Sequence, residues 1–117
     1  MNLTWKMTFM ANQMRWSTYA KVSAVLVSPF EYYRSLLVLA FAPSFNDPWY
    51  YALQNGFRVR IPHFMSGYIF REIFIDQCYD EALGLITVDT PRILEIGGNT
   101  GLFALRAKEL FPQSYIK

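Results

Sequence analysis

The chain has 117 residues, a length that suits one modest domain. Hydrophobic residues make up 53% of it and aromatic residues 18%, which excludes a disordered tail. The net charge of only +2 gives no strong field for nucleic acid, so we expect no nucleic acid partner. The single cysteine, Cys78, excludes an internal disulfide, and we expect it to be a small core residue. With one histidine, His63, a Cys/His zinc site is not expected either.

The charges are unevenly distributed along the chain. Residues 1–65 carry six basic and two acidic side chains (6 − 2 = +4), and residues 66–117 carry five basic and seven acidic ones (5 − 7 = −2). A basic front end can contact phosphates or anionic lipid, although a solvated helix face is the simpler explanation. The apolar run 36–42 is too short to cross a bilayer and too late for a secretory signal, so we expect a buried helix turn in a cytoplasmic protein.

Residues 1–42 favour helices, and a new helix is expected from Pro29 to Phe41 with Ser28 as its N-cap, because proline fixes φ and lacks an N–H. Pro43 and Pro48, with polar residues between them, predict a loop. We therefore separate a helical N-terminal region, 1–49, from a second region, 50–117. The aromatic residues of the front part are expected in the core: Trp5, Trp16, Tyr32, Tyr33, Trp49, Tyr50 and Tyr51.

After the loop, the pattern changes from helical to extended. Asn55-Gly56 predicts a turn, and the alternation over 57–61 predicts a half-buried strand with its basic side chains in solvent. Residues 68 to about 85 predict one helix with an apolar face that includes Cys78 and Ala82, ended near Gly84. His63, between the two elements, is expected to be an ordinary loop residue rather than a base.

The last third of the chain predicts a strand, turn and helix in succession. Residues 92–96 are typical of a buried strand of a parallel sheet, 102–110 predict a helix that stops near Pro112, and 114–116 open another strand. Glycines between strand and helix let a ligand approach bare backbone, and a helix N-terminus offers N–H groups. Because ligands of open α/β sheets bind beyond the carboxyl ends of strands, the turn 97–101 is expected to line a small-molecule site.

Two nucleotide motifs do not fit this turn. A dinucleotide fold requires Gly-x-Gly-x-x-Gly, which Asn99 and Leu102 break, and the Gly-Lys-Ser/Thr of a P-loop is missing. The segment Glu95-Ile96-Gly97-Gly98-Asn99-Thr100-Gly101 instead resembles the first motif of class I methyltransferases, an acidic residue followed by Gly-x-Gly-x-Gly, with Asn99 in the middle-glycine position. It is similar above all to the FkbM-type family, whose motif reads acidic-apolar-Gly-Ala-Asn-x-Gly before a Leu/Phe-rich helix.

The resemblance covers about residues 50–117, since 55–60 looks like the early β segment of that family and 71–75 like its Arg-Glu-apolar helix. It implies an α/β fold: N-terminal helices, a short β segment, and then the first βα unit of a Rossmann-like class I methyltransferase fold, truncated after that unit. It also implies S-adenosylmethionine as cofactor. The cofactor-binding residues would then be Glu95, Gly97, Gly98, Asn99 and Gly101.

By analogy with that family, the glycine-rich backbone would pack against the methionine part of the cofactor, and Glu95 would fix its amino group. The alternative for Glu95 is to cap nearby backbone N–H groups, and Asn99 either adopts a left-handed backbone or donates to the ligand. Arg71 and Glu72 either make polar contacts at the mouth of this site or belong to a solvated helix face. No metal ligand and no catalytic residue can be named from the sequence.

The implied reaction is methyl transfer to the hydroxyl of a sugar or similar small metabolite. The acidic residue that holds the cofactor ribose in this class would follow Lys117, so we expect an N-terminal fragment that is inactive and doubtfully stable alone. A second possibility is a non-catalytic methyltransferase-like interaction module whose basic aromatic helices bind a partner or a membrane surface, although no firm membrane signal is present. A third, another nucleotide-using α/β enzyme such as a dehydrogenase, is disfavoured by Asn99.

Overall fold

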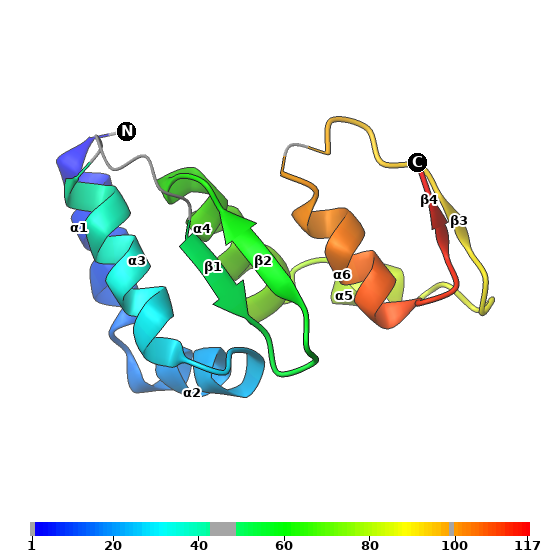
Figure 1. The fold of residues 1–117 in the computed structure, drawn as a ribbon, viewed down its shortest axis with the longest axis horizontal. Helices are drawn as coiled ribbons and strands as arrows, with labels where there is room; N and C mark the ends of the chain where they lie inside the picture. Colours follow the sequence, from blue (N-terminus) through cyan, green and yellow to red (C-terminus); the bar gives the residue numbers. More distant parts are fainter. Residues whose placement is uncertain (1, 43–48, 99) are drawn as a thin grey trace. The chain divides into compact units, whose positions relative to one another are not determined.

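The computed structural model describes residues 2–42, 49–98 and 100–117. Its contacts divide the chain into two compact units, Met1–Tyr68 and Ile69–Lys117, which Figure 1 colours from blue to green and from green to red. The architecture is mixed α/β. This division says nothing about where a methyltransferase domain begins, so the boundary at residue 49 stays a prediction.

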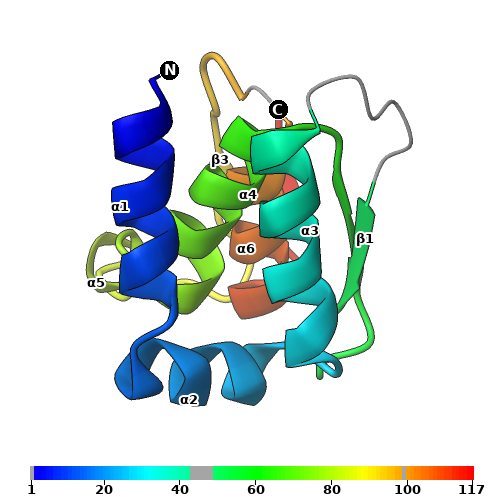
Figure 2. The same ribbon diagram turned by 90° about the vertical axis from the view of Figure 1, so that its left-hand side faces the viewer.

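Three helices form the front of the first unit: α1 (Leu3–Gln13), α2 (Trp16–Val25) and α3 (Pro29–Phe41). Figure 2 shows α1 and α3 side by side, with α2 across their lower ends. Pro29 opens α3 as predicted, whereas Ser28 holds the N-cap position without a side-chain hydrogen bond. Asn2 does cap its helix, because its Oδ1 accepts a hydrogen bond from the Trp5 N–H at 2.8 Å. The predicted helical front is therefore confirmed.

A β-hairpin follows, made of β1 (Trp49–Ala52) and β2 (Arg58–Ile61) in antiparallel register, with Trp49 opposite Ile61. The predicted turn at Asn55-Gly56 is confirmed: Gly56 has a φ of +90°, and Asn55 Oδ1 accepts a hydrogen bond from the Phe57 N–H. The strand prediction for 57–61 is confirmed as well, since β2 buries alternate residues. The loop predicted from Pro43 and Pro48 lies outside the described residues.

Tyrosines lie at the centre of the first unit's core. Tyr32 and Tyr51 are fully buried. Tyr32 donates a hydrogen bond to Gln13 Oε1 at 2.7 Å, and the Tyr51 hydroxyl is hydrogen-bonded to Ser35 Oγ. Burial holds the pKa of Tyr51 far above its usual value, so its phenol stays neutral.

The aromatic front is only partly core, so that prediction is wrong for three of its residues: Trp5, Trp16 and Tyr50 are exposed. Trp16 is 80% exposed because it lies on the outward face of α2, and Tyr50 is exposed because it points to the opposite side of β1 from Tyr51. The expected burial of the 36–42 run holds in part. Its inward residues Leu36, Leu39 and Ala40 are buried, whereas Leu37 and Phe41 are exposed.

The single helix predicted for 68 to 85 is wrong. The chain forms α4 (Phe64–Phe70), a π-helical turn η1 (Arg71–Ile75) and the short α5 (Asp80–Leu83). The wider π turn, closed by a bond from the Asp76 N–H to the Arg71 carbonyl, breaks the 3.6-residue period, and Gln77 then takes a φ of +55°. Cys78 therefore lies exposed in a turn rather than in the core, and Ala82 is exposed too. Gly84 ends α5 as predicted.

The second unit contains β3 (Arg92–Ile93), α6 (Leu102–Leu110) and β4 (Tyr115–Ile116). The two strands pair in parallel, with Arg92 opposite Tyr115, which confirms the predicted strand–helix–strand order. The predicted buried strand 92–96 is wrong in its extent and burial, because Leu94 and Ile96 are 70% and 89% exposed. Among the described residues β3 pairs with β4 alone, so no neighbouring element covers those side chains. The Rossmann-like fold stays a prediction.

An ion-pair cluster fixes α6 in the second unit. Arg106 is almost fully buried and binds Asp80 of α5 through Nε, at 3.1 Å, and through its second terminal nitrogen. It also donates to Glu109 Oε2 at 2.6 Å. The hydrogen bond with Asp80 is the main cause that raises the pKa of Arg106 above its usual value. The cluster therefore holds the helix that follows the glycine-rich turn.

Candidate ligand site after strand β3

A cavity of about 380 Å³ lies in the second unit, beyond the carboxyl end of β3. One side consists of the turn between β3 and α6, residues 94–98 and Thr100. The other side is largely apolar and is formed by Ile69, Ile73, Tyr79, Leu102 and Phe103. A volume of this size accommodates a small molecule, and the place is the one at which α/β folds bind ligands.

Two glycines shape the turn because they adopt backbone angles that other residues avoid. Gly97 has a φ of +73° and Gly101 a φ of +74°, both in the left-handed region. The turn is closed by a hydrogen bond of 2.7 Å from the Gly101 N–H to the Gly98 carbonyl. Gly101 is also the N-cap of α6, and as a glycine it has no side chain with which to cap that helix. The first N–H groups of α6 therefore remain available to a ligand.

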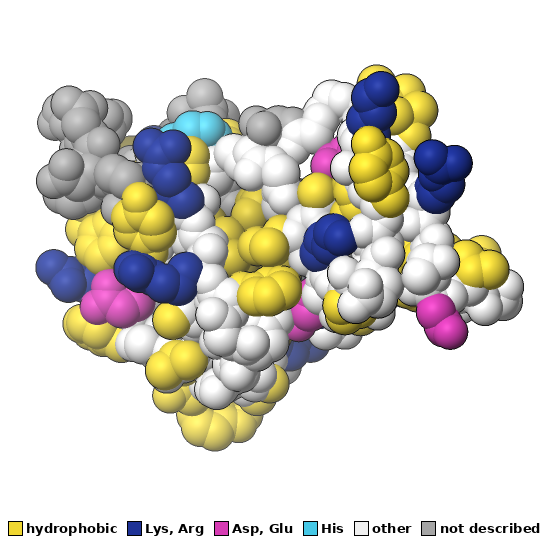
Figure 3. All heavy atoms as spheres, turned by 45° about the vertical axis from the view of Figure 1, so that its right-hand side comes forward, with side chains coloured by type: hydrophobic (Ala, Val, Ile, Leu, Met, Phe, Trp, Pro, Cys, Tyr) yellow, Lys and Arg dark blue, Asp and Glu magenta, His cyan; other side chains and the backbone are white. Residues whose placement is uncertain are grey.

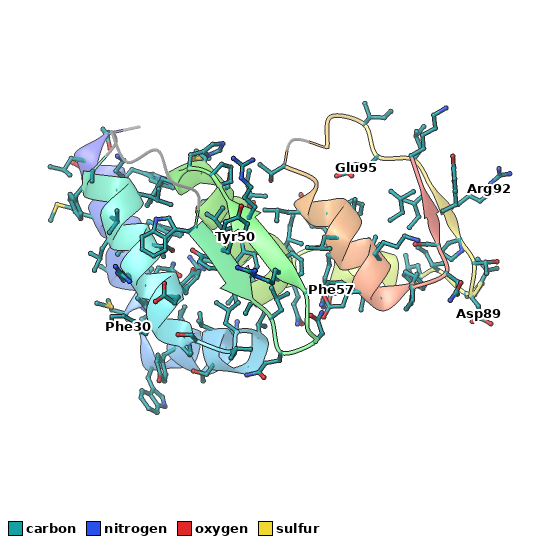
Figure 4. The ribbon with its side chains drawn as sticks, in the orientation of Figure 1. Phe30, Tyr50, Phe57, Asp89, Arg92 and Glu95 are labelled. Carbon is teal, nitrogen blue, oxygen red and sulfur yellow. The ribbon has the colours of Figure 1, made fainter. Side chains whose placement is uncertain are left out.

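Gly98 is needed for a different reason, because any side chain there would collide with the carboxylate of Glu95. A Cβ atom added to Gly98 would lie 2.9 Å from Glu95 Cδ and 3.0 Å from its Oε2, closer than nonbonded atoms approach. Figure 4 shows the Glu95 side chain descending from the loop on the side of α6. No hydrogen bond or ion pair joins this carboxylate to another side chain or N–H that the structure describes. It is thus placed over bare backbone with its hydrogen-bonding capacity unused.

The hydroxyl of Thr100 is a second polar group with unused capacity. Thr100 lines the cavity, and its Oγ1 is buried without a hydrogen-bond partner in the described parts of the chain. A buried hydroxyl without a partner is costly, and a ligand that hydrogen-bonds it would remove that cost. Sequence analysis did not identify Thr100, because its burial depends on how the turn folds back onto α6.

An aromatic pair closes the apolar side of the cavity. Tyr79 and Phe103 meet edge to face, with ring centroids 5.3 Å apart. Tyr79 comes from the turn before α5 and Phe103 from the first turn of α6. The cavity therefore combines a carboxylate and a hydroxyl on one side with apolar rings and isoleucines on the other. That combination suits a ligand with a cationic or polar end and an apolar part.

The structure brings three of the five predicted binding residues to the cavity: Glu95, Gly97 and Gly98. Gly101 shapes the turn without lining the cavity, and Asn99 lies outside the described residues. The proposed roles of all five stay predictions, because no ligand is present.

Three other candidate polar residues lie elsewhere. Arg71 is paired with Asp76 at 3.1 Å, and neither Arg71 nor Glu72 lines the cavity. His63 precedes α4, where its Nδ1 accepts a hydrogen bond from the Ser66 N–H at 3.2 Å. This is the geometry of a helix N-cap, so the imidazole has a structural role. In the described ranges no group of three or more His, Cys, Asp or Glu side chains is arranged to hold a metal ion.

Comparison with known proteins gives two partial similarities. The chain is 47% identical over 49 residues to "Methyltransferase 1" of Beauveria bassiana (strain ARSEF 2860), and 43% identical over 49 residues to "Methyltransferase sdnD" of Sordaria araneosa. Each match covers 42% of this chain and 18% of the relative. No protein-family model matches, and no solved structure is significantly similar. The similarity supports a relationship to methyltransferases, whereas the FkbM type stays a hypothesis.

Proposed function

We propose that this chain is part of an S-adenosylmethionine-dependent methyltransferase, and that the cavity after β3 holds the methionine end of the cofactor. The observation that carries the proposal is the Glu95 carboxylate, which lies over the bare backbone of Gly98 beside the uncapped N-terminus of α6. The names of the two relatives support the same class of reaction.

The residues around the cavity fit the methionine part of this cofactor. Its ammonium group requires an anionic partner, and Glu95 is a carboxylate without another partner among the described side chains. Its carboxylate requires hydrogen-bond donors, which the first N–H groups of α6 and the Thr100 hydroxyl offer. Its apolar methylene groups suit the side formed by Ile69, Ile73 and Phe103.

S-adenosylmethionine would supply the methyl group of its sulfonium centre to a nucleophile that attacks in line, and S-adenosylhomocysteine would be the leaving group. Glu95 would orient the methionine end through its ammonium group, and Gly98 would leave room for that carboxylate. The apolar side of the cavity would exclude water. Orientation of this kind supplies a large part of the acceleration in bimolecular transfers. We propose a hydroxyl of a sugar or small metabolite as the acceptor.

We further propose the FkbM type and an N-terminal position within a longer enzyme. The order of acidic residue, Gly97, Gly98, Asn99 and Gly101 supports the FkbM type. The matched stretch is 42% of this chain but only 18% of each relative, so the relatives are more than twice as long. The remaining strands of a methyltransferase sheet would then lie in other parts of the same protein.

The direct test is titration with S-adenosylmethionine and S-adenosylhomocysteine by calorimetry, on the 117-residue chain and on the natural-length protein. Glu95→Gln keeps the size of the side chain and removes its charge, and it is expected to weaken binding by about 10- to 100-fold. Glu81→Gln is the matched control, because Glu81 is exposed in the same unit and does not line the cavity. Absence of binding by the natural-length protein, or equal binding by Glu95→Gln, would refute the assignment.

A further inference from the structure

The outer face of α3 exposes three large apolar side chains. Phe30, Leu37 and Phe41 are spaced by seven and four residues, which places them on one side of the helix, and all three are exposed. The opposite side buries Tyr32 and Leu36 in the core of the first unit. A helix whose outer side carries several large apolar side chains is normally covered there as well, by protein or by lipid. The outer side of α3 is therefore a surface that requires an explanation.

Stacked aromatic rings extend this surface onto α2. Trp16 stacks on Tyr19 with ring centroids 5.5 Å apart, and Tyr19 stacks on Tyr33 of α3 at 6.2 Å. Tyr33 lies one turn after Phe30, which is 69% exposed and appears at the start of α3 in Figure 4. Trp16 and Phe30 therefore belong to one continuous surface across two helices. We call the exposed side chains of Trp16, Tyr19, Phe30 and Leu37 the α2–α3 face.

Two basic side chains flank the α2–α3 face. Arg15 directly precedes Trp16 and is exposed, and Arg34 lies one turn after Phe30 with about half of its side chain in solvent. Residues 2–42 hold four basic side chains and one acidic one (4 − 1 = +3), and the acidic one, Glu31, lies 3.7 Å from Arg34. The space-filling view shows Lys and Arg beside hydrophobic side chains on the side of the molecule that it displays (Figure 3).

We propose that the α2–α3 face docks on an anionic phospholipid membrane. Aromatic and aliphatic side chains enter the boundary between headgroups and acyl chains, and flanking Lys and Arg bind lipid phosphates. Trp and Tyr favour this depth because their rings are both apolar and polar. No helix that the structure describes is long and apolar enough to cross a membrane.

Charge and side-chain type favour lipid over the other occupants. A second copy of this surface would bring two positively charged faces together, which opposes association. A single-stranded nucleic acid would stack on Trp16 and Tyr19 but would leave the aliphatic side chain of Leu37 without a suitable contact. An anionic membrane satisfies the apolar, aromatic and basic groups at once. This inference does not depend on the proposed methyltransferase activity.

The test is sedimentation of the purified protein with phosphatidylcholine vesicles that contain or lack phosphatidylserine. Binding is expected only to the vesicles with phosphatidylserine and is expected to weaken as salt is raised. The double variant Trp16→Ser/Phe30→Ser is expected to lose affinity by at least about tenfold. Both side chains are exposed, so the fold should tolerate the change, which circular dichroism checks. Leu85→Ser/Val88→Ser is the matched control, because it removes two exposed apolar side chains from the second unit.

Three outcomes would overturn the proposal. The first is absence of binding to the anionic vesicles, and the second is equal binding by the Trp16→Ser/Phe30→Ser variant. The third is a dimer in analytical ultracentrifugation that the same variant dissociates, since the occupant would then be a second copy. Retention of cofactor binding in the variant would show that the surface and the cavity after β3 act separately.

Discussion

The substitution Gly98→Ala isolates the role of the Glu95 carboxylate. The added Cβ would lie 2.9 Å from Glu95 Cδ, whereas carbon atoms at contact are about 3.5–4.0 Å apart. The carboxylate would therefore have to retreat by about 0.6–1.1 Å or more, the difference between those distances. It lies at the end of a flexible side chain, so the fold can absorb this movement while the binding geometry cannot.

The substitution should therefore change stability only slightly and weaken cofactor binding strongly. Gly98 has no left-handed φ, so alanine reduces the entropy of the unfolded chain, and the free energy of unfolding should change by less than about 1 kcal/mol. Loss of a hydrogen bond to a charged group costs about 1.5–3 kcal/mol, so affinity for S-adenosylmethionine should fall by about 10- to 150-fold. Urea denaturation measures the first quantity and calorimetry the second.

Gly97→Ala is the control, because it reverses this pattern. Gly97 has a φ of +73°, and among the described residues no atom beyond its two chain neighbours lies within 4 Å of the position of an added Cβ. Alanine there should lower the free energy of unfolding by about 1–2 kcal/mol through backbone strain alone. The double variant Glu95→Gln/Gly98→Ala should bind no more weakly than the weaker single variant, since both act on one carboxylate. Unchanged affinity in Gly98→Ala, or a stability loss as large as that of Gly97→Ala, would refute the reasoning.

Three further predictions concern stability. Arg106→Met leaves Asp80 without its buried partner and should lower the free energy of unfolding by about 1–3 kcal/mol in urea denaturation. An unchanged midpoint would show that the ion-pair cluster does not stabilise the second unit. Because the pKa of Tyr51 is raised in the folded state, the unfolded chain ionises first, so stability should be unaffected below about pH 10 and should fall above it. That fall in the urea midpoint should be smaller in Tyr51→Phe, and an identical fall would show that Tyr51 is not its source. His63→Ala removes the N-cap of α4 and should lower the thermal midpoint, because the free energy of unfolding falls by about 0.5–2 kcal/mol. Cofactor affinity should not change, and a loss of affinity would show that the imidazole takes part in binding.

Local signals predicted the elements that depend on local chemistry. Pro29 marks the start of α3, the apolar run before Pro112 delimits α6, and Asn55-Gly56 forms the hairpin turn. Each of these residues acts through its own backbone preferences or through neighbours within one turn. The glycine-rich turn after β3 was predicted for the same reason, since Gly97 adopts an angle that favours glycine.

Features that depend on distant residues were predicted poorly. The apolar spacing before Cys78 suits a helix, but the π turn shifts the register by a residue, and the spacing of apolar residues does not indicate such a turn. Leu94 and Ile96 have the composition of a buried strand, yet burial requires covering elements on both sides. Arg106 and Asp80 are 26 residues apart, so their pairing follows from the fold and not from spacing.

The site shows the same division between local and distant causes. The positions of Glu95 and Gly98 relative to each other are set within four residues, and the sequence pattern pointed to both. The buried Thr100 hydroxyl and the Tyr79–Phe103 pair were not singled out as a binding surface, because α5 and α6 have to fold before these side chains meet.

The central claim is that the turn after β3 binds the methionine end of S-adenosylmethionine, and the glycines of the chain offer the most direct test. The six glycines of these 117 residues give amide signals in an uncrowded region of a ¹H–¹⁵N spectrum, three around the turn and three elsewhere. On addition of S-adenosylhomocysteine to the natural-length protein, the signals of Gly97, Gly98 and Gly101 should shift, whereas those of Gly56, Gly67 and Gly84 should stay in place. Shifts absent from the turn, or spread equally over all six glycines, would contradict the account.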